Sequence, residues 1–392
     1  MSTLERKGAK LVNISRRHIA LLLGAVGVGV VEIDRGKSEA AQGDQTPFTS
    51  PFAGEVNRAA KQADALFPNY RFRDGATLDR LRIHYTTLGS PHQNAHGEID
   101  NAVLVLHWTG SSGAVLLSPA YTDALYGPGK PLDARRYYLI FPDSIGCGQS
   151  SKPSDGLRAR FPNYNYGDTV DLQYKLVTET LGLKHLHALI GMSMGGMNAW
   201  QWAEAYPDFT DGVMPVVCLP IKVSGRNLIW RKLAIQSILS DPEYDHGNYT
   251  KPTRGWIQAY QLLRMMIDGV PHLQAIAPDS AGADKFISAA GAQALQEDAN
   301  DNLYSLRASR DYDPEPGLST IKTKVFALNF ADDEFNPDVL QILETRISEI
   351  KNGRYVVQPG SSTSFGHLTM AHPELWANHV GDFMGWLGDG GD

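Results

Sequence analysis

The sequence predicts a doubly wound α/β protein, in which helices cover both faces of a mostly parallel, eight-stranded sheet. Five largely apolar runs are separated by segments of helical periodicity: 102–106, 137–141, 186–190, 213–218 and 325–328. Strands that are apolar on both faces are typical of parallel sheets buried between helices. Two earlier segments, 70–72 and 82–85, alternate between apolar and polar residues and predict half-exposed strands joined at Asp74-Gly75. The last strand is expected over 354–357.

Composition excludes several other classes of protein. The chain has 392 residues, of which 42% are hydrophobic and 20% charged, so it is neither disordered nor collagenous. Cys147 and Cys218 are too few for a disulfide scaffold and lack metal-ligand spacing. The net charge of −7 gives no electrostatic reason to expect a nucleic acid partner.

The N-terminal residues have the organisation of an export signal. Residues 1–40 carry seven Lys or Arg against four acids, and the Arg16-Arg17 pair directly precedes the apolar run 20–31. Ser38-Glu39-Ala40 then offers small residues for cleavage. The Arg pair predicts a twin-arginine-type signal peptide over 1–40, with the twin-arginine export machinery as partner of the precursor. The protein is therefore expected in the periplasm or secreted, without stable membrane insertion after cleavage; an uncleaved anchor is the alternative.

The remaining chain divides by composition into four parts. Residues 41–67 begin with a Gly-, Pro-, Ser- and Thr-rich stretch and are expected to form a flexible lead-in. Residues 68–220 and 321–392 are expected to form the two parts of the α/β core. About a hundred residues separate the strands that end near Cys218 and begin near Val325, more than one crossover helix needs, so 221–320 is expected to form a helical lid.

A candidate nucleophile lies between a predicted strand and a predicted helix. Gly191-Met192-Ser193-Met194-Gly195 has the Gly-x-Ser-x-Gly pattern of a nucleophile elbow in the strand-to-helix context that this turn requires. The two glycines leave room for the tight turn, which lifts the Ser193 hydroxyl to the carboxyl edge of the sheet. The backbone N–H of Met194, at the helix N-terminus, is then expected to face a developing oxyanion.

An elbow of this kind requires an acid and a histidine later in the chain, in that order. Asp333 follows the strand 325–329 and is the predicted acid, with Asp332 as the alternative. His367 follows the predicted last strand and is the predicted base, with His372 as its rival. The second oxyanion donor is expected after the third strand, where the backbone N–H of Trp108 is the candidate.

Several segments between Tyr70 and Trp386 resemble the homoserine O-acetyltransferase branch of the α/β-hydrolase superfamily. The most specific is Gly191 to Gln201 with Tyr206-Pro207-Asp208; others are His107-Trp108-Thr109-Gly110, Gly146 to Ser150, Asp168 to Gln173 and Ile238 to Tyr244. The resemblance implies an α/β-hydrolase fold, with Ser193 as nucleophile, Asp333 as orienting acid and His367 as base. It also implies a homodimer formed through the lid.

Two departures from that family bear on the substrate. Acetyltransferases of this branch typically carry an arginine where Ile235 stands here, and an aspartate where Leu368 follows the histidine. Ile235 and Leu368 are therefore candidate residues of the substrate pocket. A site without those charged groups selects against a zwitterion such as homoserine, because its charges would be buried unpaired. An exported protein would also lack acetyl-CoA.

The sequence therefore predicts a serine hydrolase that cleaves a small-molecule carboxylic ester through an acyl-enzyme intermediate, with an apolar acyl or alcohol group accommodated by the lid. No metal or organic cofactor is required by this mechanism. An O-acyltransferase of the homoserine O-acetyltransferase type, using the same triad, is the alternative within the same chemistry. A non-catalytic binding protein on a hydrolase scaffold is the alternative of another class.

Overall fold

The computed structural model describes residues 51–388, and the predicted signal peptide over 1–40 lies outside them. Eight strands in this part form one sheet in the order β1-β2-β4-β3-β5-β6-β7-β8. Their bounds are β1 (Lys61–Arg71), β2 (Thr77–Leu88), β3 (Ala102–Leu106), β4 (Tyr138–Pro142), β5 (Leu186–Met192), β6 (Thr210–Val216), β7 (Lys324–Phe330) and β8 (Gly353–Gln358). The first two strands and the β2–β4 pair are antiparallel, and all other pairs are parallel. The predicted fold class is thereby confirmed.

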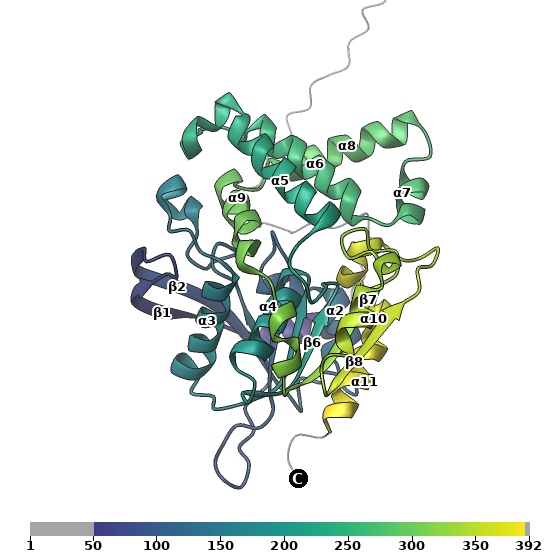
Figure 1. Ribbon diagram of the computed structural model, residues 1–392. Coiled ribbons are helices and arrows are strands. Elements are labelled where there is room, and N and C mark those ends of the chain that lie inside the picture. The colour runs from purple at the N-terminus through teal and green to yellow at the C-terminus, as the bar shows by residue number, and fades with distance from the viewer. Residues whose placement is uncertain (1–50, 389–392) are drawn as a thin grey trace, which may run out of the picture. The chain divides into compact units, whose positions relative to one another are not determined.

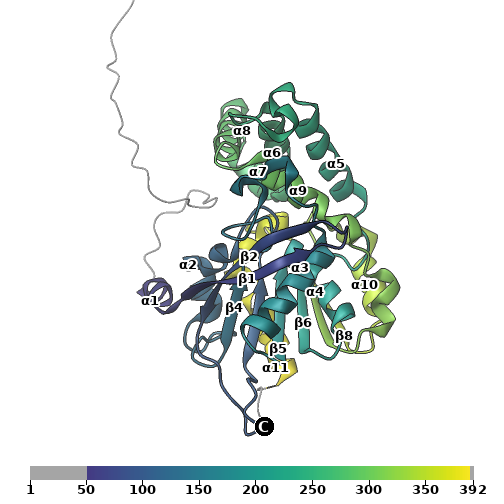
Figure 2. The same cartoon turned by 90° about the vertical axis from the view of Figure 1, so that its left-hand side faces the viewer.

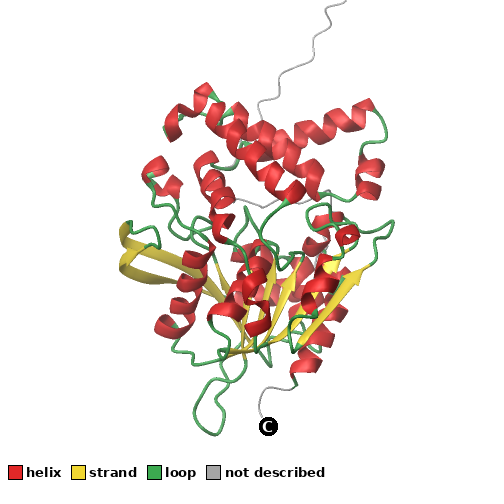
Figure 3. Cartoon of the chain, in the orientation of Figure 1, coloured by secondary structure: helices red, strands yellow, loops and turns green. Residues whose placement is uncertain are grey.

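Helices cover both faces of this sheet (Figures 1 and 3). The α-helices of residues 51–388, including those of the segment between β6 and β7, are α1 (Pro51–Ala59), α2 (Pro119–Tyr121), α3 (Tyr166–Lys175), α4 (Met194–Ala205), α5 (Gly225–Ser240), α6 (Arg254–Ile267), α7 (Val270–Ile276), α8 (Ser280–Ala294), α9 (Ala299–Ala308), α10 (Ile342–Ile347) and α11 (Ala377–Leu387). Strand β3 illustrates the layering: Leu104 and Leu106 pack in the cluster that contains residues of α3 and α4, whereas Val103 and Val105 pack in the cluster that contains residues of α11. Each face of β3 is therefore buried against a different layer of helices.

The predicted flexible lead-in over 41–67 is wrong for its described part. Helix α1 and most of β1 occupy residues 51–67, and β1 pairs with β2 from Lys61↔Thr87 to Arg71↔Thr77. The side chains of Ala65, Phe67 and Tyr70 enter the core, while most other side chains of the strand face solvent. The outward residues of β1 are mostly polar and its inward residues are few. The apolar pattern that would predict a strand is therefore weak in this segment.

The chain between β6 and β7 carries helices α5 to α9, within the segment predicted as a lid. Helices α5 to α8 lie together at one end of the sheet, above the elements of the core (Figures 1 and 2). Residues of α5, α6, α8 and α9 form an apolar cluster of their own, which includes Trp230, Ile238, Trp256 and Leu303. Phe335, which follows β7, belongs to the same cluster, so the lid packs directly on the loop after β7.

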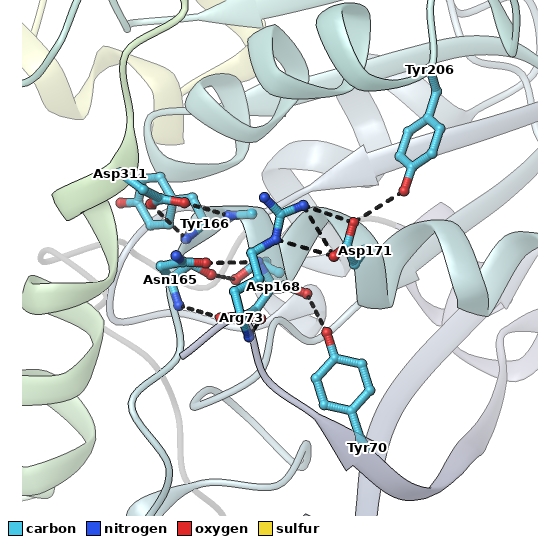
Figure 4. Close-up of polar contacts among 10 residues, drawn as sticks. Tyr70, Arg73, Asn165, Tyr166, Asp168, Asp171, Tyr206 and Asp311 are labelled. Carbon is cyan, nitrogen blue, oxygen red and sulfur yellow. Dashed lines mark hydrogen bonds and ion pairs between the residues drawn. The ribbon is translucent and has the colours of Figure 1, made fainter. Parts of the chain in front are cut away.

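Polar contacts fix the start of α3 against the turn between β1 and β2 (Figure 4). Asn165 and Asp168 form a reciprocal capping box, and a carboxylate oxygen of Asp168 also accepts the backbone N–H of Arg73 at 2.8 Å. The Arg73 guanidinium pairs with Asp171 one turn further along the helix. Asp168 and Asp171 therefore have structural roles, and these contacts give no reason to assign either of them a catalytic role. Among the described residues, no helix is long and apolar enough to span a bilayer.

Candidate active site

Ser193 lies at the junction of β5 and α4, in a backbone conformation that L-residues seldom adopt. Its φ and ψ angles are 52° and −109°, and its N–H is held by the Val216 carbonyl at 2.9 Å. A Cβ placed on Gly191 would come within 2.1 Å of the Gly195 carbonyl oxygen, and one on Gly195 within 2.5 Å of the Leu106 oxygen. Strand, turn and helix therefore approach one another too closely for any side chain, as the elbow pattern requires.

The structure brings Ser193, His367 and Asp333 into one chain of contacts. The Ser193 Oγ lies 2.9 Å from His367 Nε2, and His367 Nδ1 lies 2.7 Å from Asp333 Oδ2. All three residues are buried. Since Asp333 Oδ2 can only accept when the carboxylate is ionised, Nδ1 carries the proton and Nε2 is free to accept from the Ser193 hydroxyl. This is the arrangement in which an imidazole acts as a base toward a hydroxyl.

Asp333 is held by more than the histidine. Its Oδ1 accepts the backbone N–H of Phe335 at 2.8 Å, and its Oδ2 accepts the side-chain amide of Asn336 at 2.7 Å. The same Asn336 amide donates to the Val217 carbonyl at 2.9 Å. Asn336 thus connects the Asp333 loop to the end of the neighbouring strand. Asn336 was not predicted from the sequence, where its place three positions after the predicted acid is the available signal.

Asp332, the alternative acid, points elsewhere. Its Oδ2 accepts the Ser364 hydroxyl at 2.6 Å and the Gly366 backbone N–H at 3.1 Å. Gly366 directly precedes His367 and begins a 3-10 helix, Gly366–Ala371. The two adjacent carboxylates therefore have different contacts: Asp333 touches the imidazole, and Asp332 holds the loop that carries it.

His372, the rival base, has no contact with Ser193. Its ring stacks on Phe365 at 3.9 Å between centroids, and its Nδ1 lies 3.2 Å from a Glu374 carboxylate oxygen. His272 of the lid also contacts the Phe365 ring. These rings pack the end of the His367 loop against the lid.

The loop after β3 lies beside the N-terminus of α4. The His107 carbonyl accepts the Gly195 N–H at 3.1 Å, which joins the two segments. Burial lowers the pKa of His107, so its imidazole is neutral: Nε2 accepts the Ser144 N–H at 3.0 Å, and Nδ1–H donates to the Trp108 carbonyl at 2.8 Å. Within residues 51–388, the N–H groups of Trp108, Thr109 and Met194 have no hydrogen-bond acceptor. Thr109 thus adds a third free donor to the predicted pair.

The two candidate pocket residues occupy different parts of the fold. Ile235 is half-buried on α5 and packs against the lid cluster, and Leu368 is half-buried immediately after His367. Trp230, also on α5, contacts Phe335 with ring centroids 5.4 Å apart, and Phe335 contacts His367 at 5.3 Å. A line of rings therefore connects the lid to the imidazole, which the sequence analysis did not identify. In the described part of the chain, no cluster of His, Cys, Asp or Glu is arranged to hold a metal ion.

Comparisons with known proteins agree with this fold. The α/β hydrolase fold family matches residues 114–243. A probable acyltransferase of Methanothermobacter thermautotrophicus is 28% identical over 276 residues, 70% of this chain and 83% of that protein. The homoserine O-acetyltransferase of Solidesulfovibrio magneticus is 36% identical over 221 residues, 51% of this chain and 53% of that protein. The chain thus spans about half the length of the homoserine O-acetyltransferase that it matches.

Solved structures share the same architecture. An acetylester hydrolase from Corynebacterium glutamicum has a TM-score of 0.71 at 19% identity, covering 83% of this chain and 95% of that one. A homoserine O-acetyltransferase from Bacillus anthracis has a TM-score of 0.72 at 22% identity, covering 83% and 97%. At these identities the likeness concerns the fold. The chain therefore has the α/β-hydrolase fold, and its sequence is similar to those of a probable acyltransferase and of homoserine O-acetyltransferases.

Proposed function

We propose that the protein hydrolyses carboxylic esters through an acyl-enzyme intermediate on Ser193. The observation that carries the proposal is the unbroken contact from the Ser193 hydroxyl through His367 to the Asp333 carboxylate. Such a chain activates a hydroxyl that is otherwise a weak nucleophile at neutral pH. Ser193 is also held in a strained turn that presents it at the edge of the sheet.

In the proposed reaction, His367 takes the proton of Ser193 as the Ser193 oxygen attacks the ester carbonyl. Asp333 keeps the imidazole in the required tautomer and stabilises its positive charge. The oxyanion that forms is bound by the N–H groups of Met194 and Trp108, with the Thr109 N–H as a further donor. His367 then protonates the leaving alcohol. In the second half, it deprotonates the water molecule that releases the acid and restores Ser193.

Hydrolysis is favoured over transfer to homoserine by two residues. Ile235 and Leu368 stand where the acetyltransferases of this branch typically carry charged groups, so the site offers no partners at those positions for the substrate's carboxylate and ammonium. The Phe335 ring contacts His367 and the Trp230 ring contacts Phe335, so the surroundings of the base are apolar, as an apolar acyl or alcohol group requires.

Acyl transfer is the second candidate, since the similar proteins include a probable acyltransferase and homoserine O-acetyltransferases. In that case, an alcohol or amine replaces water in the second half-reaction. We further propose that the protein works outside the cytoplasm, on the basis of the Arg16-Arg17 pair and the apolar run that follows. Acetyl-CoA would be absent there. Replacing Arg16 and Arg17 together by Lys should retain the protein in the cytoplasm, as fractionation would measure.

The decisive experiment compares the wild-type protein with Ser193→Ala on p-nitrophenyl acetate and butyrate. The variant should lose turnover by several orders of magnitude, and a fluorophosphonate probe should label only the wild type. Full activity of Ser193→Ala would contradict the proposed nucleophile. Consumption of acetyl-CoA in the presence of an alcohol, faster than hydrolysis of the simple esters, would instead establish the acyltransferase.

A further inference from the structure

Arg231 is a buried cation without a counter-ion. Its side chain is on α5 and the residue is 5% exposed. The Nε–H donates to Asn227 Oδ1 at 2.8 Å, but Nη1 is buried without a hydrogen-bond partner. No Asp or Glu of the described residues forms an ion pair with this guanidinium. A buried charge that lacks an opposite charge costs several kcal/mol, so its retention calls for a reason.

Two further polar groups beside Arg231 are also unsatisfied. The Tyr166 hydroxyl and the Thr109 hydroxyl are buried, and neither has a hydrogen-bond partner within residues 51–388. Burial raises the pKa of Tyr166, while the facing Arg231 charge and the Thr109 hydroxyl act in the opposite direction. Arg231 and Thr109 therefore lie close enough to Tyr166 to influence its hydroxyl, although the three residues come from three different elements. Buried polar groups are rarely left unpaired without a ligand or water between them.

The positions of these groups are fixed from outside the cluster. Tyr166 begins α3, where its backbone N–H and that of Gly167 donate to the Asp311 carboxylate at 3.1 and 2.9 Å (Figure 4). The Asp311 carboxylate therefore accepts hydrogen bonds from the first turn of α3 and forms no ion pair with Arg231. Thr109 follows Trp108 in the loop that is joined to α4 through His107. The cluster consequently adjoins the loop that carries the proposed oxyanion donors.

We propose that Arg231, with the hydroxyls of Tyr166 and Thr109, binds a carboxylate carried by the substrate. The proposal rests on the ester hydrolysis proposed above and specifies its substrate: an ester with an apolar body that ends in a carboxylate. The guanidinium presents parallel N–H donors that match a carboxylate, and each hydroxyl adds one donor. A phosphate dianion fits less well, because a single cation would leave one of its charges unpaired.

Arg231 differs in position from the arginine of the acetyltransferases. It precedes Ile235 by four residues, so both lie on the same side of α5, one turn apart. Position 235 alone indicates a site without a cationic partner for a carboxylate. Arg231 places a guanidinium one turn away on the same helix, where position 235 gives no sign of it.

The test uses pairs of esters that differ only in the charged group. For a carboxylate on the alcohol side the pair is 3-acetoxybenzoate and 3-acetoxybenzamide; for the acyl side it is monomethyl glutarate and methyl 4-carbamoylbutanoate. The wild type should prefer the anionic member of one pair by tenfold or more in kcat/KM. Arg231→Gln should lower kcat/KM for that member by about 10- to 100-fold, mainly through KM, as expected for a charged hydrogen bond. The neutral member should change by less than about threefold, a contrast that loss of structure alone would not produce.

Two further variants complete the design. Tyr166→Phe removes one hydroxyl and should lower kcat/KM for the anionic ester by several-fold, which keeps the test decisive if Arg231→Gln does not fold. Lys232→Gln, on the exposed side of the same helix, is the matched control and should leave both esters unchanged. The proposal is overturned if the wild type shows no preference in either pair, or if Arg231→Gln affects both members equally.

A binding measurement separates this proposal from the proposed catalysis. Calorimetry requires no turnover; it compares 3-hydroxybenzoate with 3-hydroxybenzamide, and glutarate with its neutral diamide, glutaramide. If none of the four esters is cleaved, the proposed hydrolysis fails, yet tighter binding of a carboxylate that Arg231→Gln abolishes would still support the subsite. Equal binding of the charged and neutral ligands in both comparisons would overturn it.

Discussion

The Asn336 side-chain amide donates to the carboxylate of Asp333 at 2.7 Å, on the same oxygen that faces His367. Asn336 is itself fixed, because Asn329 donates to its carbonyl at 2.8 Å and its amide also reaches Val217. The orientation of Asp333 is therefore set by the ends of two neighbouring strands, β6 and β7. The acid presents one fixed lone pair to the imidazole.

Asn336→Ala should lower kcat by about tenfold, equivalent to ~1.4 kcal/mol, because the Asp333 carboxylate loses a charged hydrogen bond and can rotate. KM should change little, because Asn336 is buried and its side chain contacts Asp333. Steady-state kinetics with p-nitrophenyl acetate provides the measurement. Asn352→Ala, which removes an exposed asparagine that donates to the Lys322 carbonyl, serves as control and should behave as the wild type. A rise in KM without loss of kcat would argue against the positioning role.

Asp333→Asn and Asp332→Asn should differ sharply in their effects. Asparagine at 333 can donate to Nδ1 of His367 and so favours the wrong tautomer, for which a loss of about 10⁴-fold in kcat is expected. Asparagine at 332 keeps an oxygen acceptor for the Ser364 hydroxyl and the Gly366 N–H, so a loss of at most about tenfold is expected. The same p-nitrophenyl ester assay compares them. Equal losses in the two variants would mean that the assignment of the acid is wrong.

The strands and the Ser193 contact chain were predictable because each has a signature within a short segment. The runs at 102–106 and 186–190 are apolar on both faces, and Gly-x-Ser-x-Gly marks a turn whose steric demands are local. Only the end of β1 was predicted, at 70–72; the rest of the strand was missed because its inward residues are spaced among polar ones.

Arg231 and Asn336 escaped the sequence analysis for a different reason. A sequence shows that a residue is an arginine or an asparagine, but not that its counter-ion is missing or which carboxylate it touches. The environment of Arg231 is created where α5 lies near the start of α3 and the loop after β3. Contacts between elements that are distant in the sequence depend on tertiary packing, and no short sequence pattern predicts them.

Gly195→Ala should destabilise the protein, because its Cβ would lie 2.5 Å from the Leu106 oxygen and 2.7 Å from the Leu106 Cβ. Both neighbours belong to a buried central strand and cannot move aside, so a loss of about 2 kcal/mol or more is expected. Gly385→Ala is the control: it lies in α11 with no atom within 4 Å of the added Cβ, and should stabilise the helix by about 0.5–1 kcal/mol. Denaturant unfolding measures both. A stable, active Gly195→Ala would contradict the close approach of α4 and β3.

Glu204 on α4 should make stability depend on pH near neutrality. Burial raises its pKa to about 7 from an ordinary 4.5, and the negative charge of Asp313 adds to the effect. Between these values the unfolded chain has released the proton while the folded protein still binds it. Stability therefore falls as pH rises through this window and stays lower above it.

Glu204→Gln removes this ionisation, so its Tm relative to the wild type should rise between pH 5 and pH 8. Because the side chain is only partly buried, solvent screening limits the expected gain to about 2–4 °C. Thermal melts at a series of pH values test this, with Glu344→Gln on the exposed side of α10 as the control. That control should shift Tm equally at every pH. A difference between Glu204→Gln and wild type that stays constant from pH 5 to 8 would show that Glu204 ionises alike in the folded and unfolded states.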